Sequence, residues 1–287
     1  MIQSILPTNR PLAELLLRTH KNVFSSKIGE NTTNIKGSGY DFVHLKEYEN
    51  GGDVKHIDWL VSAKFNKHYV KVFQEQRELH LVIVPLLSAS VRFGVKVLKQ
   101  DIIAEICALL SFSAVKQNNT FSSYISQEKT TLCTPRSKSL FNVRSLVEKT
   151  FESDTLGKAI NYQELSKVLY MHEREKSLLF LVGDFFQTDS FDFHALCTKH
   201  ELTCIVVRDK FEEEPESLGR IHLRDPHSGE AAFVELNAKA SAKIKQKVLQ
   251  ADSIFFDKLS RAGVRFIKVY TNEDPAKKIM GIMSRLS

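Results

Sequence analysis

The sequence predicts an α/β fold: a doubly wound, mostly parallel sheet with a smaller β-containing N-terminal extension and an inserted hairpin. Strands buried on both faces of a parallel sheet are apolar nearly throughout, and three runs have this character. They lie at residues 79–87, 177–182 and 202–207. Segments with helical apolar spacing alternate with these runs, which is typical of an open, doubly wound sheet. We expect residues 1–77 to form the extension, and residues 78–287 to form the sheet domain with a hairpin at 220–236.

The composition is that of a folded protein with a sizeable core. The chain has 287 residues, of which 43% are apolar and 26% are charged. No apolar run approaches the roughly 18 residues that span a bilayer, and the first residues lack a signal-peptide pattern, so we expect a cytoplasmic protein. The net charge of +6 permits nucleic-acid contact. Its densest basic cluster, at 239–247, is explained by a solvated helix face.

The N-terminal part contains one short helix, a loop and a strand in our prediction. Apolar residues at Leu12–Leu17 indicate the helix, and the Ser, Asn and Gly content of residues 25–39 indicates the loop. Gly51-Gly52-Asp53 is a turn signal, because glycine takes positive φ freely and Asp bonds to the turn backbone. The alternation at Tyr69–Phe73 predicts the strand.

The sheet domain begins with the run at 79–87, which should end or bulge near Pro85 because proline donates no ladder hydrogen bond. We interpret His80 as a satisfied edge residue. Apolar spacing from Val95 to Ser113 predicts a long amphipathic helix. Further strands are expected at 120–126, 130–133, 220–224, 231–236 and 264–270, and further helices at 140–151, 163–172, 191–200, 238–262 and 275–286.

One stretch, residues 46–78, concentrates a glycine pair, carboxylates and the only Trp. Its candidate structural or partner-contact residues are Gly52, Asp53, Lys55, Asp58 and Trp59. A Trp beside carboxylates and a glycine turn can be a binding site. It can equally be a small core anchor whose neighbouring acids cap the turn, and the residue types alone favour this second interpretation.

Several spaced motifs of this region agree in order with one known family. They are Gly37-x-Gly39, Lys46-x-Tyr48, Gly52-Asp53-x-Lys55-x-Ile57-Asp58-Trp59, Ala63-Lys64 and Val70-Lys71-x-Phe73. Together they resemble the signature of bacterial proteins in domain-of-unknown-function (DUF) family 58. Lys replaces the usual Arg at positions 46, 55 and 64, which keeps the charge but not bidentate geometry. The resemblance continues through residues 205–230 to the C-terminus.

The resemblance implies a von Willebrand factor A-like, Rossmann-like fold with a cation loop at the carboxyl ends of the strands, where doubly wound sheets bind ligands. Here the loop residues are Ser88, Ser90 and Asp184. The leading carboxylate position holds Leu86, and no Thr stands at residues 157–161. A hard cation needs a nearly complete set of oxygen ligands, so we expect a degenerate metal-ion-dependent adhesion site with no metal, or weak Mg²⁺ at most. The alternative role for these residues is helix or turn capping.

By the same resemblance, such proteins work with MoxR-type AAA+ ATPases in assembling or activating other proteins. The sequence contains no GxSxG elbow, HExxH motif or P-loop, so we expect a non-catalytic adaptor that contacts a MoxR-type ATPase and a client protein. One alternative is a cation-dependent ligand-binding domain. A more distant one is a nucleic-acid-binding protein, suggested by the basic charge.

Overall fold

The computed structural model describes residues 12–25, 40–48, 54–65, 67–75, 78–186, 188 and 190–283. The chain divides into two compact units, a small one of residues 30–78 and a large one of residues 1–29 and 79–287. Helix α1 (Leu12–Ser25) belongs to the large unit, whereas the sequence placed it in the extension. It packs on α3 (Lys99–Lys116), where the Lys116 Nζ donates to the Val23 carbonyl at 2.9 Å.

The small unit is an antiparallel pair of strands with two short helical segments. The strands are β1 (Tyr40–Glu47) and β2 (Tyr69–Glu75), and the connection contains the 3-10 turn η1 (Val54–His56) and α2 (Trp59–Phe65). The predicted strand at 69–73 is therefore confirmed, while β1 and α2 were not predicted.

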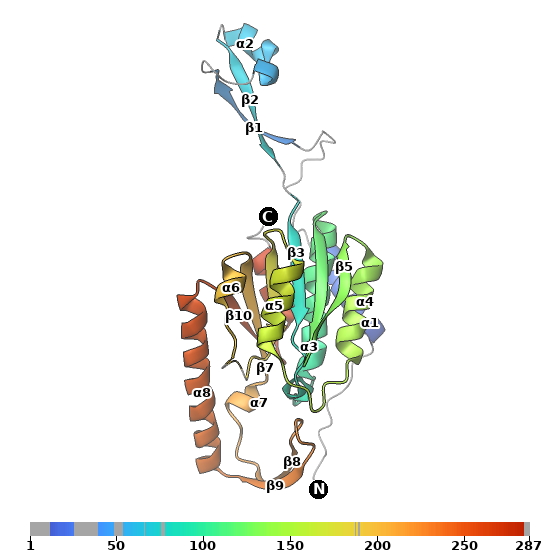
Figure 1. Cartoon of the computed structure of the whole chain (residues 1–287), viewed down its shortest axis with the longest axis vertical. Coiled ribbons are helices and arrows are strands. Elements are labelled where there is room, and N and C mark those ends of the chain that lie inside the picture. The colour runs from blue at the N-terminus through green and yellow to red at the C-terminus, as the bar shows by residue number, and fades with distance from the viewer. Residues whose placement is uncertain are drawn as a thin grey trace. The chain divides into compact units, whose positions relative to one another are not determined.

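Six strands form the central sheet of the large unit, in the order β10-β7-β6-β3-β4-β5 (Figure 1). Their bounds are β3 His80–Pro85, β4 Thr120–Ser126, β5 Thr130–Ser137, β6 Leu178–Gly183, β7 Glu201–Arg208 and β10 Arg265–Tyr270. The first strand of this sheet in chain order, β3, lies in its middle. Strands β4 and β5 follow on one side of β3, and β6, β7 and β10 follow on the other side. All neighbours pair in parallel except β4 and β5. The predicted doubly wound, mostly parallel sheet is confirmed.

Helices cover both faces of this sheet (Figure 1). On one face, the alternate residues Leu81 and Ile83 of β3 pack with α1, α3, α4 (Leu140–Glu152) and α9 (Pro275–Met283). On the other face, Val82 and Val84 pack with α5 (Tyr162–His172), α6 (His194–Cys197) and α8 (Ala238–Arg261). The two cores thus follow from the period-2 alternation of a strand that is buried on both sides.

Helix α3 differs from its prediction in two ways. It is buried on nearly all sides rather than amphipathic, because α1, α4 and α9 cover the face that would otherwise meet solvent. It also begins at Lys99 instead of near residue 95. Gly94 lies in a tight loop before it, where an added Cβ would lie 1.9 Å from the Val97 carbonyl oxygen.

Two further expectations need correction. The helix predicted at 191–200 is only the single turn α6, because Phe191 and Phe193 are buried in an aromatic cluster with Tyr162 and Phe255. His80 is satisfied by hydrogen bonds, as expected, but it lies on the central strand β3 and not at an edge.

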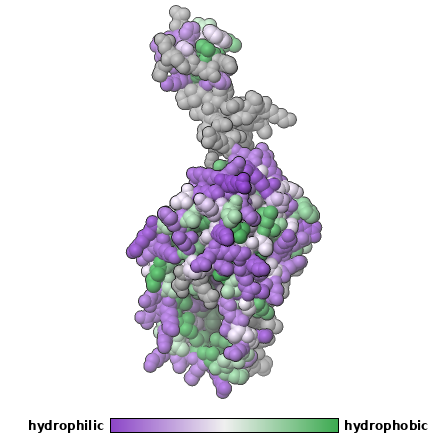
Figure 2. Space-filling model, in the orientation of Figure 1, coloured by the Kyte–Doolittle hydropathy of each residue, from purple (hydrophilic) through white to green (hydrophobic). Residues whose placement is uncertain are grey.

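The inserted hairpin is confirmed as β8 (Gly219–Arg224) and β9 (Ala231–Leu236). Its turn contacts the loop between α4 and α5, where the Gly157 amide donates a hydrogen bond to the Pro226 carbonyl at 3.0 Å. Apolar side chains gather in a hollow beside the hairpin and α8 (Figure 2). Exposed large apolar residues of these two elements are Leu223, Phe233, Val234, Ile244, Leu249 and Ile254.

Among the described residues, no helix combines the length and the apolar character that crossing a membrane requires. All four cysteines are free thiols, of which Cys107 and Cys204 are buried.

Candidate functional site

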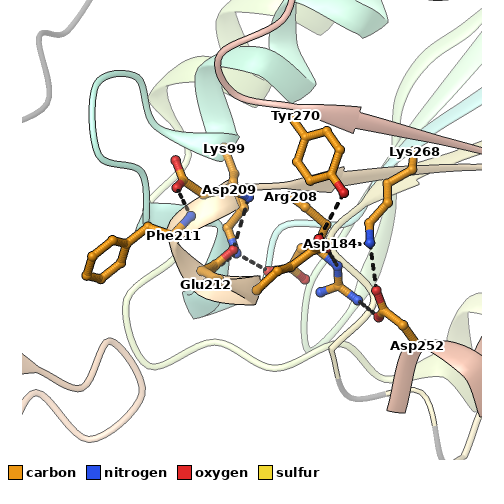
Figure 3. Close-up of polar contacts among 10 residues, drawn as sticks. Lys99, Asp184, Arg208, Asp209, Phe211, Glu212, Asp252, Lys268 and Tyr270 are labelled. Carbon is orange, nitrogen blue, oxygen red and sulfur yellow. Dashed lines mark hydrogen bonds and ion pairs between the residues drawn. The ribbon is translucent and has the colours of Figure 1, made fainter. Parts of the chain in front are cut away.

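Polar side chains converge at the carboxyl edge of the central sheet (Figure 3). Because parallel strands end at the same edge, the segments after β3, β6 and β7 meet there. They bring Ser88, Ser90 and Asp184 to one small hollow, whose other lining residues are Ile160, Tyr162 and Phe186. The hollow has room for about one water molecule.

The two serines bond to each other rather than capping a helix. The Ser88 Oγ lies 2.8 Å from the Ser90 Oγ. Ser88 precedes the 3-10 turn η2 (Ala89–Arg92), but its side chain makes no capping hydrogen bond. The capping alternative is therefore wrong for Ser88, which lines the hollow while its hydroxyl is paired with that of Ser90.

A buried lysine occupies the centre of the site. Lys99, the first residue of α3, has a fully buried side chain whose Nζ lies 2.9 Å from Asp184 Oδ2 and 2.6 Å from Glu212 Oε1. The ammonium also lies 4.8 Å from the centroid of the Phe186 ring. Asp184 is thus an ion-pair partner of Lys99.

The two carboxylates respond differently to this shared charge. Burial alone would raise the pKa of Asp184, but the Lys99 ammonium and the Ser90 hydroxyl outweigh it, so the pKa lies below its usual value. For Glu212, burial dominates over the pull of Lys99 and raises the pKa. The Lys99 ammonium favours the ionised form of both carboxylates, and burial outweighs this effect only at Glu212.

The residues at this edge do not fit a divalent cation. A second positive ion on the Asp184 carboxylate would be repelled at close range by the Lys99 ammonium. Leu86, which stands at the leading carboxylate position, is a buried core residue. It packs so closely on Gly183 that a Cβ added to this glycine would lie 2.8 Å from the Leu86 Cβ. The Thr nearest to residues 157–161, Thr155, does not supply the missing hydroxyl, because it is buried and does not line the hollow.

A second ion network lies beside the first. The buried Arg208 guanidinium donates to Asp252 Oδ1 at 2.6 Å, and Lys268 bridges Asp252, at 2.8 Å, and Glu213. The Tyr270 hydroxyl donates to Glu213 Oε2 at 2.9 Å. These groups come from β7, β10, α7 (Lys210–Glu213) and α8, so the network ties two strands and two helices together.

Helix α7, which carries Glu212 and Glu213, is itself held in place. Asp209 forms a capping box with Glu212, and its other oxygen accepts the Thr271 hydroxyl at 2.6 Å. A four-residue helix has little stability of its own, so these contacts and the ion pairs determine where its carboxylates lie.

The candidate signature residues lie in the small unit. Gly52 and Asp53 are outside the described residues, and so is the side chain of Lys55, whose backbone is part of η1. Asp58 caps α2, since its Oδ1 accepts from the amides of Leu60 and Val61 at 3.1 Å each. The bond from Val61 and an ion pair with Lys71 at 3.1 Å lower the pKa of Asp58.

Trp59 is not a core anchor. Its side chain is 66% exposed and meets the His68 ring edge-on at 6.1 Å between centroids. Leu60 is 87% exposed, and Val54 and Phe65 are also exposed. We call these four residues the Trp59 surface. Sequence reasoning preferred a buried Trp because aromatic residues usually supply core area, but α2 buries Ser62 against β2 instead.

Sequence reasoning missed the charged residues of the sheet edge: Lys99, Arg208, Glu212, Glu213, Asp252 and Lys268. One signal was present, because Lys99 starts a long apolar helix and Arg208 ends an apolar strand. Charged residues at the boundaries of buried elements are paired when the fold covers them. Which residues pair could not be read from the sequence.

Comparisons with known proteins identify distant relatives. Uncharacterized proteins of Mycobacterium tuberculosis (strain H37Rv) and Mycobacterium bovis are 23% identical over 206 residues, which cover 70% of this chain and 65% of each relative. The chain thus matches about two thirds of the length of these curated relatives.

Similar solved structures include the conserved hypothetical protein BatB from Bacteroides thetaiotaomicron, with 12% identity, a TM-score of 0.47, and coverage of 72% of this chain and 98% of that one. A von Willebrand factor type A protein from Catenulispora acidiphila has 10% identity and a TM-score of 0.37, covering 74% of this chain and 43% of that one. Sequence identities and TM-scores this low do not support the transfer of a function from these structures to this chain.

The family comparison covers most of the chain. The model of DUF58, described as a protein of unknown function, matches residues 44–252, which include α2, the central strands β3 to β7, the hairpin of β8 and β9, and most of α8. This match confirms the resemblance seen in the signature motifs, and the chain belongs to the DUF58 family.

Proposed function

We propose that this protein is a non-catalytic, cytoplasmic adaptor that binds a MoxR-type AAA+ ATPase and a client protein. The observation that carries the proposal is the Trp59 surface, an exposed apolar set in the most distinctive segment of the sequence. Trp59 and Leu60 are adjacent at the start of α2 and both are largely exposed, and Trp is enriched among the residues that dominate binding energy at interfaces.

The local structure supports display of this surface. Asp58 fixes the first turn of α2 through two backbone amides and is held by Lys71 of β2. The Tyr69 amide donates to the buried Ser62 hydroxyl at 2.9 Å, which ties the inner side of α2 to the same strand. With its inner side anchored, α2 presents Trp59 and Leu60 outward in a defined orientation, so little conformational entropy is lost when a partner covers them.

The carboxyl edge of the sheet supports the non-catalytic part of the proposal. Its charged groups are paired with one another and buried, as Lys99 is with Asp184 and Glu212. The hollow beside them holds about one water molecule, whereas pockets for small-molecule ligands are typically at least about 300 Å³. The same pairing argues against the alternative of cation-dependent ligand binding.

Binding measurements between the purified protein and a MoxR-type ATPase from the same organism, with ATP present, test the proposal. Trp59→Ala should weaken the affinity by about tenfold or more, since truncation of a central interface Trp typically costs over 1.4 kcal/mol. Phe141→Ala is the matched control, because Phe141 is an exposed aromatic residue on α4 of the large unit and should not change the affinity.

Two outcomes would contradict the proposal. If the wild-type protein does not associate with the ATPase in any nucleotide state, the adaptor role with this partner is wrong. If it associates but Trp59→Ala binds as tightly as Phe141→Ala, the Trp59 surface is not the contact.

A further inference from the structure

The Lys99 ammonium lies between two carboxylates, and one of them also lines the hollow of Ser88 and Ser90. It contacts Asp184 directly, and Asp184 lines the same small hollow as the Ser88 and Ser90 hydroxyls. Glu212 contacts the ammonium from the other side at 2.6 Å. Carboxylate oxygens that share one buried positive charge are among the ligands that hard divalent cations prefer.

We infer that the Lys99 side chain takes the place of a divalent cation at the Ser88, Ser90 and Asp184 site. The positive charge that this edge needs is supplied by the chain itself, so the site is complete without metal. This inference concerns the large unit alone and does not depend on the proposed adaptor function.

The surroundings of Lys99 show that its position is built rather than incidental. Its side chain is fully buried, and its own amide donates to the Phe93 carbonyl at 2.9 Å. The second acceptor, Glu212, is positioned by the Asp209 capping box and the Thr271 contact. A buried ammonium is stable only when its hydrogen bonds are satisfied, and two charged acceptors and the Phe186 ring satisfy this one.

Removal of the ammonium should convert this edge into a cation site. Lys99→Ala leaves two carboxylates that converge on the space vacated by the lysine, and one of them, Asp184, also lines the hollow of Ser88 and Ser90. Two uncompensated buried carboxylates destabilise the fold, and a divalent cation that binds them would restore stability in proportion to its affinity.

The test is thermal unfolding and calorimetric titration with Mn²⁺ and Mg²⁺ as the probes. For the wild-type protein, millimolar metal should leave the melting temperature unchanged within about 1 °C and give no binding heat. For Lys99→Ala, the melting temperature should fall in the absence of metal and rise by several degrees with millimolar Mn²⁺. The double variant Lys99→Ala with Asp184→Asn should lose this rise.

Lys268→Ala is the matched control. It also removes an ammonium shared by two carboxylates, Asp252 and Glu213, but Arg208 remains to compensate them. Mn²⁺ should therefore not stabilise it. An equal Mn²⁺ response in Lys268→Ala and Lys99→Ala would show a general carboxylate effect and overturn the inference.

A second readout remains if Lys99→Ala does not fold. Wild-type protein that binds Mn²⁺ at millimolar or tighter affinity, with binding lost in Asp184→Asn, would show that the lysine does not replace the cation. A folded Lys99→Ala variant whose melting temperature does not rise with Mn²⁺ would also overturn the inference.

Discussion

The small unit and the carboxyl edge of the large sheet place their chemically distinctive residues in opposite environments. The small unit exposes its apolar residues, with Trp59 and Leu60 directed to solvent. The sheet edge buries its charged residues, with Lys99 and Arg208 almost inaccessible. An exposed apolar side chain gains free energy only from a partner outside the unit, whereas a buried charge must find its partner inside.

Because of this difference, the charged residues of the sheet edge contribute to folding, whereas the exposed residues of α2 are available for binding. At the sheet edge, buried ion pairs within the chain link β7, β10, α7 and α8 to one another. On α2, the anchoring groups Asp58 and Ser62 are satisfied while the outer side chains have no covering partner among the described residues. Substitutions at the sheet edge should therefore act on stability, and substitutions on α2 should act on association.

The largest expected effect is that of Arg208→Met. The substitution keeps most of the buried volume but leaves Asp252 with Lys268 alone and removes a cation that contacts the Phe186 ring at 3.6 Å. Breaking a buried pair by removing one partner costs about 3–5 kcal/mol of the free energy of unfolding. Urea denaturation monitored by circular dichroism measures this loss.

Arg144→Met on α4 is the comparison for this measurement. Arg144 pairs with Glu148 one turn later, but its side chain is 68% exposed. Exposed pairs contribute roughly 0–1 kcal/mol, so the change should be small. If both variants lose the same stability, the network of Arg208 does not have the role that we assign to it.

The fold was largely predictable because its strongest signals are local. A strand buried on both faces must be apolar along its whole length, and the runs predicted at 79–87, 177–182 and 202–207 correspond to the neighbouring strands β3, β6 and β7. The hairpin and its turn followed from alternating residues around Gly229, whose φ of 75° requires glycine. These signals need no knowledge of distant contacts.

The candidate site was predictable only in part, because its pairing is long-range. Ser88, Ser90 and Asp184 could be placed at one edge, since parallel strands end together. That Lys99 would reach Asp184 depends on α3 starting beneath β6, and that Glu212 would join them depends on a four-residue helix held by Asp209. The exposure of Trp59 was mispredicted for a related reason, because α2 buries a serine and displays its aromatic residue.

A second expected effect concerns pH and the polar cluster at the amino-terminal end of β3. Burial would raise the pKa of Glu173, but hydrogen bonds from His80, Ser122 and Tyr124 outweigh it and lower the pKa to about 2. Because this value lies below the unfolded value of 4.5, Glu173 stabilises the fold above about pH 4.5. The stabilisation is lost as the pH falls from 4.5 towards 2.

Glu173→Gln tests this expectation while keeping the side-chain shape. The variant should be less stable than the wild type at pH 6, and the two should converge as the pH falls to 3, because the wild-type carboxylate becomes protonated in the unfolded state. Urea denaturation at several pH values measures the difference. A difference that is constant across this range would show that the charge of Glu173 contributes nothing to the stability of the large unit.

The smallest expected effect is local and sharpens the role of α2. Asp58→Ala removes the acceptor of the Leu60 and Val61 amides and the partner of Lys71, so these two amides should exchange with solvent several-fold faster while the large unit is unchanged. Asn161→Ala, which removes the equivalent cap from α5, is the control and should accelerate exchange only at the start of that helix. If Asp58→Ala weakens ATPase binding while Trp59 remains in place, the cap acts by holding the Trp59 surface in orientation. Unchanged exchange at Leu60 and Val61 would mean that α2 keeps its orientation without Asp58, and the display of Trp59 would then depend on the Ser62 anchor alone.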